Sequence, residues 1–421
     1  MRAVMSDTIK AAPQTPTCFA CGARLTHTWI DLGLSPLANS YVAVERAHIP
    51  DPLYPLHARV CEECLLVQVD SVVSPQAIFS DYAYFSSYSD SWLAHCHAYV
   101  AMAANRFGLN QNSKVVEIAS NDGYMLQYFV ARNVPVLGVE PAANVAAVAR
   151  QRGVPTEVDF FGAETARRLA KRGDSADLLA AKNVLAHVPD INDFVAGIAI
   201  LLKRDGVFTV EFPHLLNLIR EVQFDTIYHE HFTYLSLLAV ERVFERYGLR
   251  VFAVEEVPTH GGSLRVFACL KGAVHIEEPN VAAMRKIEID AKLDRLEGYE
   301  GFEARVRTVR EDLLAFLRTA KAEGRKVVGY GAAAKGNTLL NYCSIGPDLL
   351  PFISDRSAAK QGKLSPGSRI PIRLPEEAIQ ARPDFVLILP WNLRTEIEHQ
   401  LTPIRAYGGR FVTAIPNLRI S

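Results

Sequence analysis

The sequence has no excess of charge of either sign. Lys and Arg together number 45, and Asp and Glu number 46, which gives a formal net charge of −1. A general nucleic-acid-binding protein normally carries a basic excess that neutralises phosphates. The balanced charge therefore argues against nucleic acid as a partner.

Long apolar runs are also missing, although 49% of the residues are hydrophobic. The longest runs are interrupted well before the roughly 20 residues that a membrane-spanning helix needs. Low-complexity segments and short tandem repeats are absent from the sequence as well. The composition is that of a globular protein without a membrane partner, and 421 residues are enough for two or three domains.

The sequence shows no secretory leader, so we expect a reducing, cytoplasmic environment. Three of the seven cysteines, Cys96, Cys269 and Cys343, are scattered along the chain. In a reducing compartment we expect them to be unpaired core residues.

The other four cysteines stand in two CxxC pairs, Cys18 with Cys21 and Cys61 with Cys64. Two such pairs supply the four thiolates of a tetrahedral zinc site, and four sulfur ligands leave no coordination position open for a substrate. Two disulfides or four unlinked thiols are the alternatives. We expect a structural zinc site in a small module over residues 14–80.

Beyond this module, predicted strands and helices alternate twice. This βαβ rhythm indicates parallel sheets with helices on both faces. The fold class is therefore α/β, with two Rossmann-like doubly wound sheets preceded by a zinc-binding module. We expect one domain over residues 81–255 and another over 256–421. A helix is expected over 87–107 and a long helical stretch over 281–323. The expected strands are 115–118, 136–140, 177–181, 207–212, 326–331, 351–355, 385–389 and 409–412.

The turn after the first predicted strand, residues 117–123, contains one glycine and begins with an acid. A dinucleotide-binding turn has three glycines that bring a pyrophosphate close to a helix terminus. S-adenosylmethionine (SAM) has no pyrophosphate and carries cationic groups, so it suits this turn better than NAD. An acid that ends the next strand can accept hydrogen bonds from ribose hydroxyls, although such an acid is more often a solvated cap. The candidate cofactor-binding residues are Glu117, Ser120, Asn121, Asp122, Gly123, Glu140 and Asn183.

Residues 223–232 include Tyr228, His229, Glu230 and His231, which can supply a general base and a partner that orients it. The alternative is that Tyr228 and His231 pack on one face of a helix while His229 and Glu230 face solvent. The run lacks the HExxH spacing of a helical zinc site, so a metal role is disfavoured.

These motifs, taken together, resemble the SAM-dependent C-methyltransferases that act on 4-keto nucleotide sugars. The resemblance extends from about residue 16 to residue 418, and its motifs occur in the same order. They are the two CxxC pairs and residues 81–87, 117–123, 228–232, 260–265, 329–336, 355–363, 366–367 and 370–371.

The resemblance implies transfer of a methyl group from SAM to C3 of a nucleotide-linked 4-keto-6-deoxysugar through an enolate. It implies that His231 is the base and that Glu230 orients it or handles a second proton. Tyr228 and Tyr82 would donate to the developing oxyanion or steer the sugar, with Tyr84 as a competitor for Tyr82. His229 departs from members that have aspartate there, so the choice between the two histidines stays open.

The resemblance also implies that the second sheet holds the nucleoside diphosphate of the substrate. Glycines after His260 permit close backbone approach, and an arginine is a natural partner for phosphate, but a buried strand turn explains this motif equally well. Asp355 either caps a strand or contacts the nucleotide. The candidate substrate-binding residues are Tyr84, His260, Gly262, Arg265, Lys335, Asp355, Lys360 and Lys363.

Three other functions compete with this interpretation. The glycine turn Gly329-x-Gly331, followed by Lys335 and Gly336, would serve an NAD(P)-dependent nucleotide-sugar oxidoreductase or epimerase. The cysteine module would serve a non-catalytic nucleic-acid-binding protein. The residue 228–231 segment would also serve a methyltransferase acting on a ketone that is not a sugar. The sequence leaves the sugar, the nucleotide and the oligomeric state open.

Overall fold

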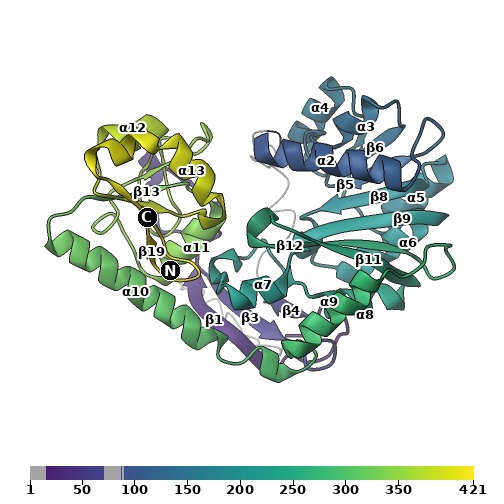
Figure 1. The fold of residues 1–421 in the computed structure, drawn as a ribbon, viewed down its shortest axis with the longest axis horizontal. Coiled ribbons are helices and arrows are strands. Elements are labelled where there is room, and N and C mark those ends of the chain that lie inside the picture. Colours follow the sequence, from purple (N-terminus) through teal and green to yellow (C-terminus); the bar gives the residue numbers. More distant parts are fainter. Residues whose placement is uncertain (1–15, 71–86, 88–89) are drawn as a thin grey trace, which may run out of the picture.

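The computed structural model describes residues 16–70, 87 and 90–421. It contains an N-terminal module (residues 16–70), a central α/β unit (90–290) and a C-terminal α/β unit (302–421). In Figure 1 the central and C-terminal units lie side by side, and strands of the N-terminal module lie between them at the lower side of the view. Tyr82 and Tyr84 lie outside the described residues.

The N-terminal module is built on an antiparallel sheet with the order β1-β3-β4-β10. Its fourth strand, β10, belongs to the central unit by sequence and pairs with β4. The chain therefore returns to the N-terminal module after it has formed most of the central sheet. The strands are β1 (His27–Ser35), β3 (Tyr54–Val60), β4 (Val67–Val69) and β10 (Thr233–Tyr234), and the short β2 (Val42–Ala43) and η1 (Val44–Arg46) lie between β1 and β3.

The central unit contains a seven-stranded sheet with the order β11-β12-β9-β8-β5-β6-β7. The strands from β9 to β7 are parallel, and β12 is antiparallel to both of its neighbours. All four residues of β5 are buried, as expected for a strand covered on both faces. The strands are β5 (Val115–Ile118), β6 (Val136–Val139), β7 (Thr156–Glu157), β8 (Ala176–Lys182), β9 (Leu202–Pro213), β11 (Leu249–Val257) and β12 (Ser263–Leu270).

Helices cover both faces of this sheet. One face packs against α5, α6 and α8, and the other against α2 and α3. The helices are α2 (Asp90–Arg106), α3 (Leu126–Val130), α4 (Ala143–Gln151), α5 (Ala163–Arg172), α6 (Ile191–Leu201), α7 (Leu215–Arg220), α8 (Leu237–Arg246) and α9 (Pro279–Asp290), with single 3-10 turns η3 (Leu185–His187), η4 (Phe224–Thr226) and η5 (Thr259–Gly261). The predicted alternation of strands and helices is confirmed.

The expected boundary between residues 255 and 256 falls near the end of β11, a strand of the central sheet. Strand β12 begins at Ser263 and lies between β9 and β11. The predicted helical stretch 281–323 is two helices, α9 and α10 (Phe302–Ala322), separated by η6 (Leu296–Gly298). The second α/β sheet starts only at Val327.

The C-terminal unit contains a six-stranded sheet with the order β16-β14-β13-β17-β18-β19, parallel except for β19. The short β15 (Lys363–Leu364) leaves this sheet and pairs with β2 of the N-terminal module. The strands of the sheet are β13 (Val327–Tyr330), β14 (Ile353–Ser354), β16 (Ile372–Arg373), β17 (Phe385–Ile388), β18 (Arg410–Thr413) and β19 (Arg419–Ile420). The helices are α11 (Ala334–Tyr342), α12 (Pro375–Gln380) and α13 (Arg394–Gln400), with η7 (Trp391–Leu393) and η8 (Thr402–Tyr407).

The N-terminal module shares a hydrophobic core with each of its neighbours. Trp29 on β1 stacks on Phe302 at the start of α10, with ring centroids 4.5 Å apart. Three of the paired cysteines, Cys18, Cys61 and Cys64, are buried in the core of the central unit. The module therefore connects the two α/β units. Within the described ranges, the helices are too short or too polar to cross a membrane.

Candidate active site

The four paired cysteines converge on one point. Their sulfur atoms all lie within 4.8 Å of one another, and none of the four is in a disulfide. The Sγ atoms of Cys18 and Cys64 are 3.4 Å apart, as are those of Cys21 and Cys61. A tetrahedral zinc ion with Zn–S bonds of about 2.3 Å needs sulfur separations of about 3.8 Å. The four thiols therefore fit zinc with a small adjustment.

Contacts from the central unit hold the first cysteine pair. Asn192 on α6 donates from Nδ2 to the carbonyl oxygen of Phe19 at 2.7 Å, and Arg246 on α8 donates to that of Ala20. Three of the four sulfur ligands are buried. This closed environment supports a structural role for the site.

The turn after β5 has an unusual backbone. Ala119, Asn121 and Gly123 have φ angles of 52°, 49° and 78°, in the left-handed region. Glu140, at the end of β6, accepts hydrogen bonds from the backbone amides of Asn121 and Ala142, each at 2.9 Å. The carboxylate that sequence analysis assigned to a ribose thus also fixes the turn, and its oxygens keep lone pairs for further donors.

Several polar atoms in this turn and at the end of β8 are suited to a ligand with hydrogen-bond donors. Within the described part of the chain, Ser120 Oγ, Asp122 Oδ1 and Asn183 Oδ1 are buried without a hydrogen-bond partner. Burial raises the pKa of Glu117 well above its usual value, against the effect of the nearby Tyr124 hydroxyl. Unsatisfied buried acceptors are costly, and the ammonium and hydroxyl groups of SAM would satisfy them.

One carboxylate oxygen of Asp122 is already engaged by the protein. Its Oδ2 lies 2.9 Å from Nη1 of Arg152 and also accepts from the hydroxyl of Ser87. Arg152 follows α4, so this ion pair connects the turn after β5 to the segment between β6 and β7. Only Oδ1 of Asp122 remains for a ligand.

Residues 227–232 form a non-helical turn, so the alternative of a helix with one packed face is wrong. The structure pairs Tyr228 with His231: the tyrosine hydroxyl lies 2.7 Å from Nε2 of the imidazole. Nδ1 of His231 lies 2.8 Å from the carbonyl oxygen of Thr226, which can only accept. His231 therefore carries its proton on Nδ1, and its Nε2 accepts from Tyr228.

The charge state of His231 follows from its surroundings. Burial, above all, and then neighbouring groups that include Lys335 hold the pKa of His231 well below its usual value. The imidazole is therefore neutral at pH 7, with a lone pair on Nε2 that can receive a proton.

The expectation that Glu230 orients His231 is not met. Within the described residues, the hydrogen-bond partners of His231 are Thr226 and Tyr228, whereas Oε2 of Glu230 lies 2.5 Å from Nδ2 of Asn39 in the N-terminal module. Burial raises the pKa of Glu230 to about 7. The chain turns Glu230 away from the imidazole, so a separate role for its carboxyl group is open.

His229 lies on the other side of the turn. Its Nε2 is 3.1 Å from the carbonyl oxygen of Pro55, and its ring packs edge-on against Tyr54 of β3. It is 3% exposed. The structure thus directs His231, not His229, toward the other candidate residues.

Further basic side chains gather around His231. The ring of His187 is 4.7 Å from that of His231, and burial lowers the pKa of His187 to about 4. His260 lies with Nε2 2.9 Å from Nδ2 of Asn183 at the end of β8. Lys335, at the start of α11, is close enough to lower the pKa of both His231 and His260. The site therefore collects groups from the carboxyl ends of both α/β sheets, where ligands of such folds bind.

Lys335 is positioned by residues that the sequence did not single out. Its Nζ donates to Oδ1 of Asn392 at 2.9 Å and lies 4.6 Å from the ring centre of Trp391. The indole of Trp391 in turn donates to Asp225 at 2.8 Å. Burial raises the pKa of Asp225 to about 6.

Arg265 needs correction as a substrate-binding residue, whereas the substrate contact of Gly262 stays a prediction. Arg265 lies on β12 inside the central unit, where it donates to Glu211 at 2.6 Å and to Glu255 at 2.8 Å. Its donors are thus used by the protein. The space that a side chain at residue 262 would need is taken by Asn217, whose Nδ2 would be 2.4 Å away.

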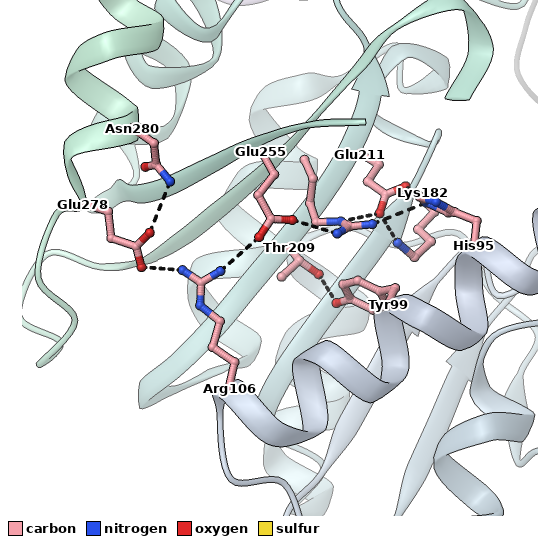
Figure 2. Close-up of polar contacts among 10 residues, drawn as sticks. His95, Tyr99, Arg106, Lys182, Thr209, Glu211, Glu255, Glu278 and Asn280 are labelled. Atoms are coloured by element: carbon pink, nitrogen blue, oxygen red, sulfur yellow. Dashed lines mark hydrogen bonds and ion pairs between the residues drawn. The ribbon is translucent and has the colours of Figure 1, made fainter. Parts of the chain in front are cut away.

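Figure 2 shows the polar network that contains Glu211 and Glu255 and runs from His95 and Lys182 to Arg106 and Glu278. Its hub is Glu211, which is 1% exposed. This carboxylate accepts from Lys182, from Arg265 and from His95, the last at 2.8 Å. The network fixes α2 on the strands of the central sheet.

The remaining candidates lie in the C-terminal unit. Asp355 accepts backbone hydrogen bonds from Ala332 and Ser357, each at 2.7 Å, so it caps the turn after β13. Lys360 donates to the carbonyl oxygen of Ala332 at 2.8 Å. Lys363 lies on β15 with its backbone paired to β2 and its side chain half-exposed. Of the two lysines, Lys360 contacts the turn after β13, whereas Lys363 contacts the N-terminal module through its backbone.

Comparisons with known proteins agree with this architecture. Family models match a zinc binding domain over residues 18–79, a methyltransferase domain over 92–254 and a C-methyltransferase C-terminal domain over 258–416. The C-methyltransferase NovU of Streptomyces niveus is 39% identical over 406 residues, which cover 96% of each chain. The chain belongs to the C-methyltransferase family. It is a SAM-dependent enzyme with a zinc-binding N-terminal module, as the sequence predicted.

More distant relatives match only part of the chain. The ubiquinone biosynthesis O-methyltransferase of Bartonella quintana is 27% identical over 123 residues, 28% of this chain and 50% of that protein. Among solved structures, magnesium protoporphyrin IX methyltransferase from Synechocystis with bound SAM is 12% identical. That alignment covers 48% of this chain and 99% of the other, with a TM-score of 0.35.

Proposed function

We propose that this C-methyltransferase transfers a methyl group from SAM to C3 of a nucleotide-linked 4-keto-6-deoxysugar. The observation that carries the proposal is the pair formed by Tyr228 and His231, in which a neutral imidazole accepts a hydrogen bond from a phenol at 2.7 Å. Such a pair is suited to taking a proton from a carbon next to a ketone.

The charge around this pair supports an anionic substrate. His187 and His260 lie near His231, but burial lowers the pKa of each to about 4, so both are neutral near pH 7. Lys335 would be the cation that meets a diphosphate: burial lowers its pKa, and the nearby Asp225 opposes that effect. The same positive field favours the negative charge that develops on the ketone oxygen when C3 loses its proton. A neutral, non-sugar ketone would use only the second of these effects.

In the proposed reaction the C3–H bond breaks and its proton passes to the hydroxyl of Tyr228, while the phenol proton passes to Nε2 of His231. The net result is a substrate enolate and a protonated His231. Thr226 keeps the imidazole in the tautomer that leaves Nε2 free, because its carbonyl oxygen holds the Nδ1 proton at 2.8 Å. SAM, when bound, supplies the electrophilic methyl group that C3 acquires.

We assign SAM to the turn after β5, with Ser120, Asn121 and Gly123 from the turn, Glu140 from β6 and Asn183 from β8. The buried acceptors Ser120 Oγ and Asn183 Oδ1 support this assignment. We assign the nucleoside diphosphate to the C-terminal unit near Lys335 and Lys360. The N-terminal module would then act mainly as the connection between these two binding units.

Incubation with SAM and a panel of nucleotide 4-keto sugars, followed by mass spectrometry, tests the proposal. The panel includes dTDP-, GDP- and CDP-linked sugars, their 4-hydroxy counterparts as matched controls, and simple ketones. We expect a mass increase of one methylene for at least one keto sugar and none for its 4-hydroxy counterpart. Methylation of simple ketones alone would contradict the substrate class.

A further inference from the structure

Asn39 makes a contact that joins two units of the molecule. Its Nδ2 lies 2.5 Å from Oε2 of Glu230, which is 191 residues away in the sequence. Asn39 is exposed in the turn that follows β1, whereas Glu230 is 5% exposed. An exposed residue of the N-terminal module thus contacts a buried carboxyl group in residues 227–232.

The turn that carries Asn39 is held by the C-terminal unit on both sides. Asn337 on α11 donates from Nδ2 to the carbonyl oxygen of Ala38 at 2.7 Å. The hydroxyl of Tyr41 donates to the carbonyl oxygen of Ala332 at 2.5 Å. Asn39 therefore stands between two anchored residues, which fix the position of its backbone near Glu230.

The opposite end of the N-terminal module is attached to the central unit. Asn192 and Arg246 bind the backbone of the first cysteine pair, as described above. Because the N-terminal module is attached at both ends, the positions of the residues between its ends are fixed relative to both α/β units. Asn39 is where the N-terminal, central and C-terminal units meet.

We propose that Asn39 is a positioning residue of the methyl-transfer site, and that its amide holds the carboxyl group of Glu230 in place. The inference rests on the proposed function for its catalytic consequence, but the contact itself does not depend on the identity of the substrate. It gives the N-terminal module a part in the reaction in addition to its structural one.

The groups around Glu230 determine how the Asn39 amide changes the pKa of its carboxyl group. His187 donates to the backbone carbonyl of Glu230 at 2.7 Å, and His231 points toward Tyr228. The Tyr41 hydroxyl lies near Glu230, and beyond it lie Asp355 and Lys360. Burial raises the pKa of Glu230 to about 7, and the Asn39 amide opposes this rise because it stabilises the ionised form. Loss of the amide therefore shifts the titration of Glu230 to higher pH.

Infrared difference spectroscopy during a pH titration measures this shift without turnover. The carboxyl band of Glu230 is the one that disappears in Glu230→Gln. In Asn39→Ala we expect its midpoint to rise by about one pH unit, since a hydrogen bond to a charged group has that effect. The matched control is Ser40→Ala, a neighbouring exposed residue, which should leave the midpoint in place. An unchanged midpoint in Asn39→Ala, with normal zinc content and melting temperature, would overturn the inference.

A double-mutant cycle measures the catalytic consequence. We expect Asn39→Ala to lower kcat/KM about tenfold in the wild-type background and not at all in Glu230→Ala. Equal losses in both backgrounds would mean that Asn39 does not act through Glu230. Failure of the wild-type enzyme to methylate any keto sugar would instead contradict the proposed function, and the infrared titration would still decide the role of Asn39.

Discussion

The hydroxyl of Tyr228 and Nε2 of His231 lie 2.7 Å apart, in a turn where the imidazole is held from its other side by the carbonyl oxygen of Thr226. The pair places a neutral proton acceptor between the carboxyl ends of two α/β sheets. The backbone carbonyl of Thr226 fixes the tautomer of His231, so no carboxylate is needed for this purpose. This relationship leads to the first prediction.

Replacement of Tyr228 by Phe removes the hydroxyl but keeps the ring. We expect kcat to fall by roughly 10²–10⁴-fold, the range that general acid–base groups contribute. SAM affinity, measured by calorimetry, should not change, because Tyr228 lies outside the turn assigned to SAM. A weakened SAM affinity with an unaltered kcat would contradict the role of Tyr228 in proton transfer.

Cys61→Ser should release zinc, because a serine hydroxyl is a poor substitute for a thiolate ligand. With zinc lost, the shared core of the N-terminal module loosens, and we expect the melting temperature to fall by roughly 5–10 °C. Metal content and calorimetry measure the two effects. Cys343→Ser is the matched control: Cys343 is 1% exposed and packs in a different hydrophobic core from Cys18, Cys61 and Cys64, so this variant should keep its zinc. Full zinc content in Cys61→Ser would contradict the assignment.

Arg265→Met tests whether Arg265 stabilises the fold or binds phosphate. The change leaves the buried Glu211 with one cation fewer, and breaking a buried ion pair typically costs about 3–5 kcal/mol of unfolding free energy. We expect lower stability in denaturant but an unchanged KM for the nucleotide sugar. Lys335→Met, by contrast, should raise that KM. A raised KM in Arg265→Met without loss of stability would restore Arg265 as a phosphate ligand.

The pH dependence of stability should carry a contribution from Glu230. Its pKa rises on folding from 4.5 to about 7, so the folded state holds the proton more tightly. The stability that this proton contributes is complete below pH 4.5 and is lost as the pH rises through 7. Glu230→Gln should therefore be as stable as wild type near pH 4.5 and more stable above pH 7, by up to about 3 kcal/mol. Equal stability at all pH values would mean that Glu230 is not buried as described.

The sequence predicted the elements of the fold well, because each strand of the α/β units carries its own apolar pattern. The predicted boundary between residues 255 and 256 leaves β12 in the C-terminal domain, although β12 pairs within the central sheet. The motif that starts at His260 fitted a ligand turn and a buried strand turn equally well, and in the structure it leads into β12, which pairs with β9 about 50 residues earlier. Strand order depends on contacts between distant segments, and local patterns do not contain them.

Only the local part of the candidate site could be predicted, because local patterns do not contain contacts between distant segments. Tyr228 and His231 are three residues apart, so their proximity is visible in the sequence. The partner of Glu230 is Asn39, and the partner of Arg265 is Glu211, 54 residues away. Neither partner belongs to a motif, and a lone asparagine or glutamate gives no signal. The backbone carbonyl of Thr226 that orients His231 has no side-chain signature at all.

Exchange of the C3 hydrogen in heavy water, with a nucleotide 4-keto sugar and no methyl donor, tests the central claim most directly. NMR spectroscopy should show the wild-type enzyme replacing this hydrogen by deuterium. His231→Ala, with an unchanged melting temperature, should show no exchange above the enzyme-free rate. Exchange by His231→Ala at the wild-type rate would show that another group removes the proton, and the account of the Tyr228–His231 pair would be wrong.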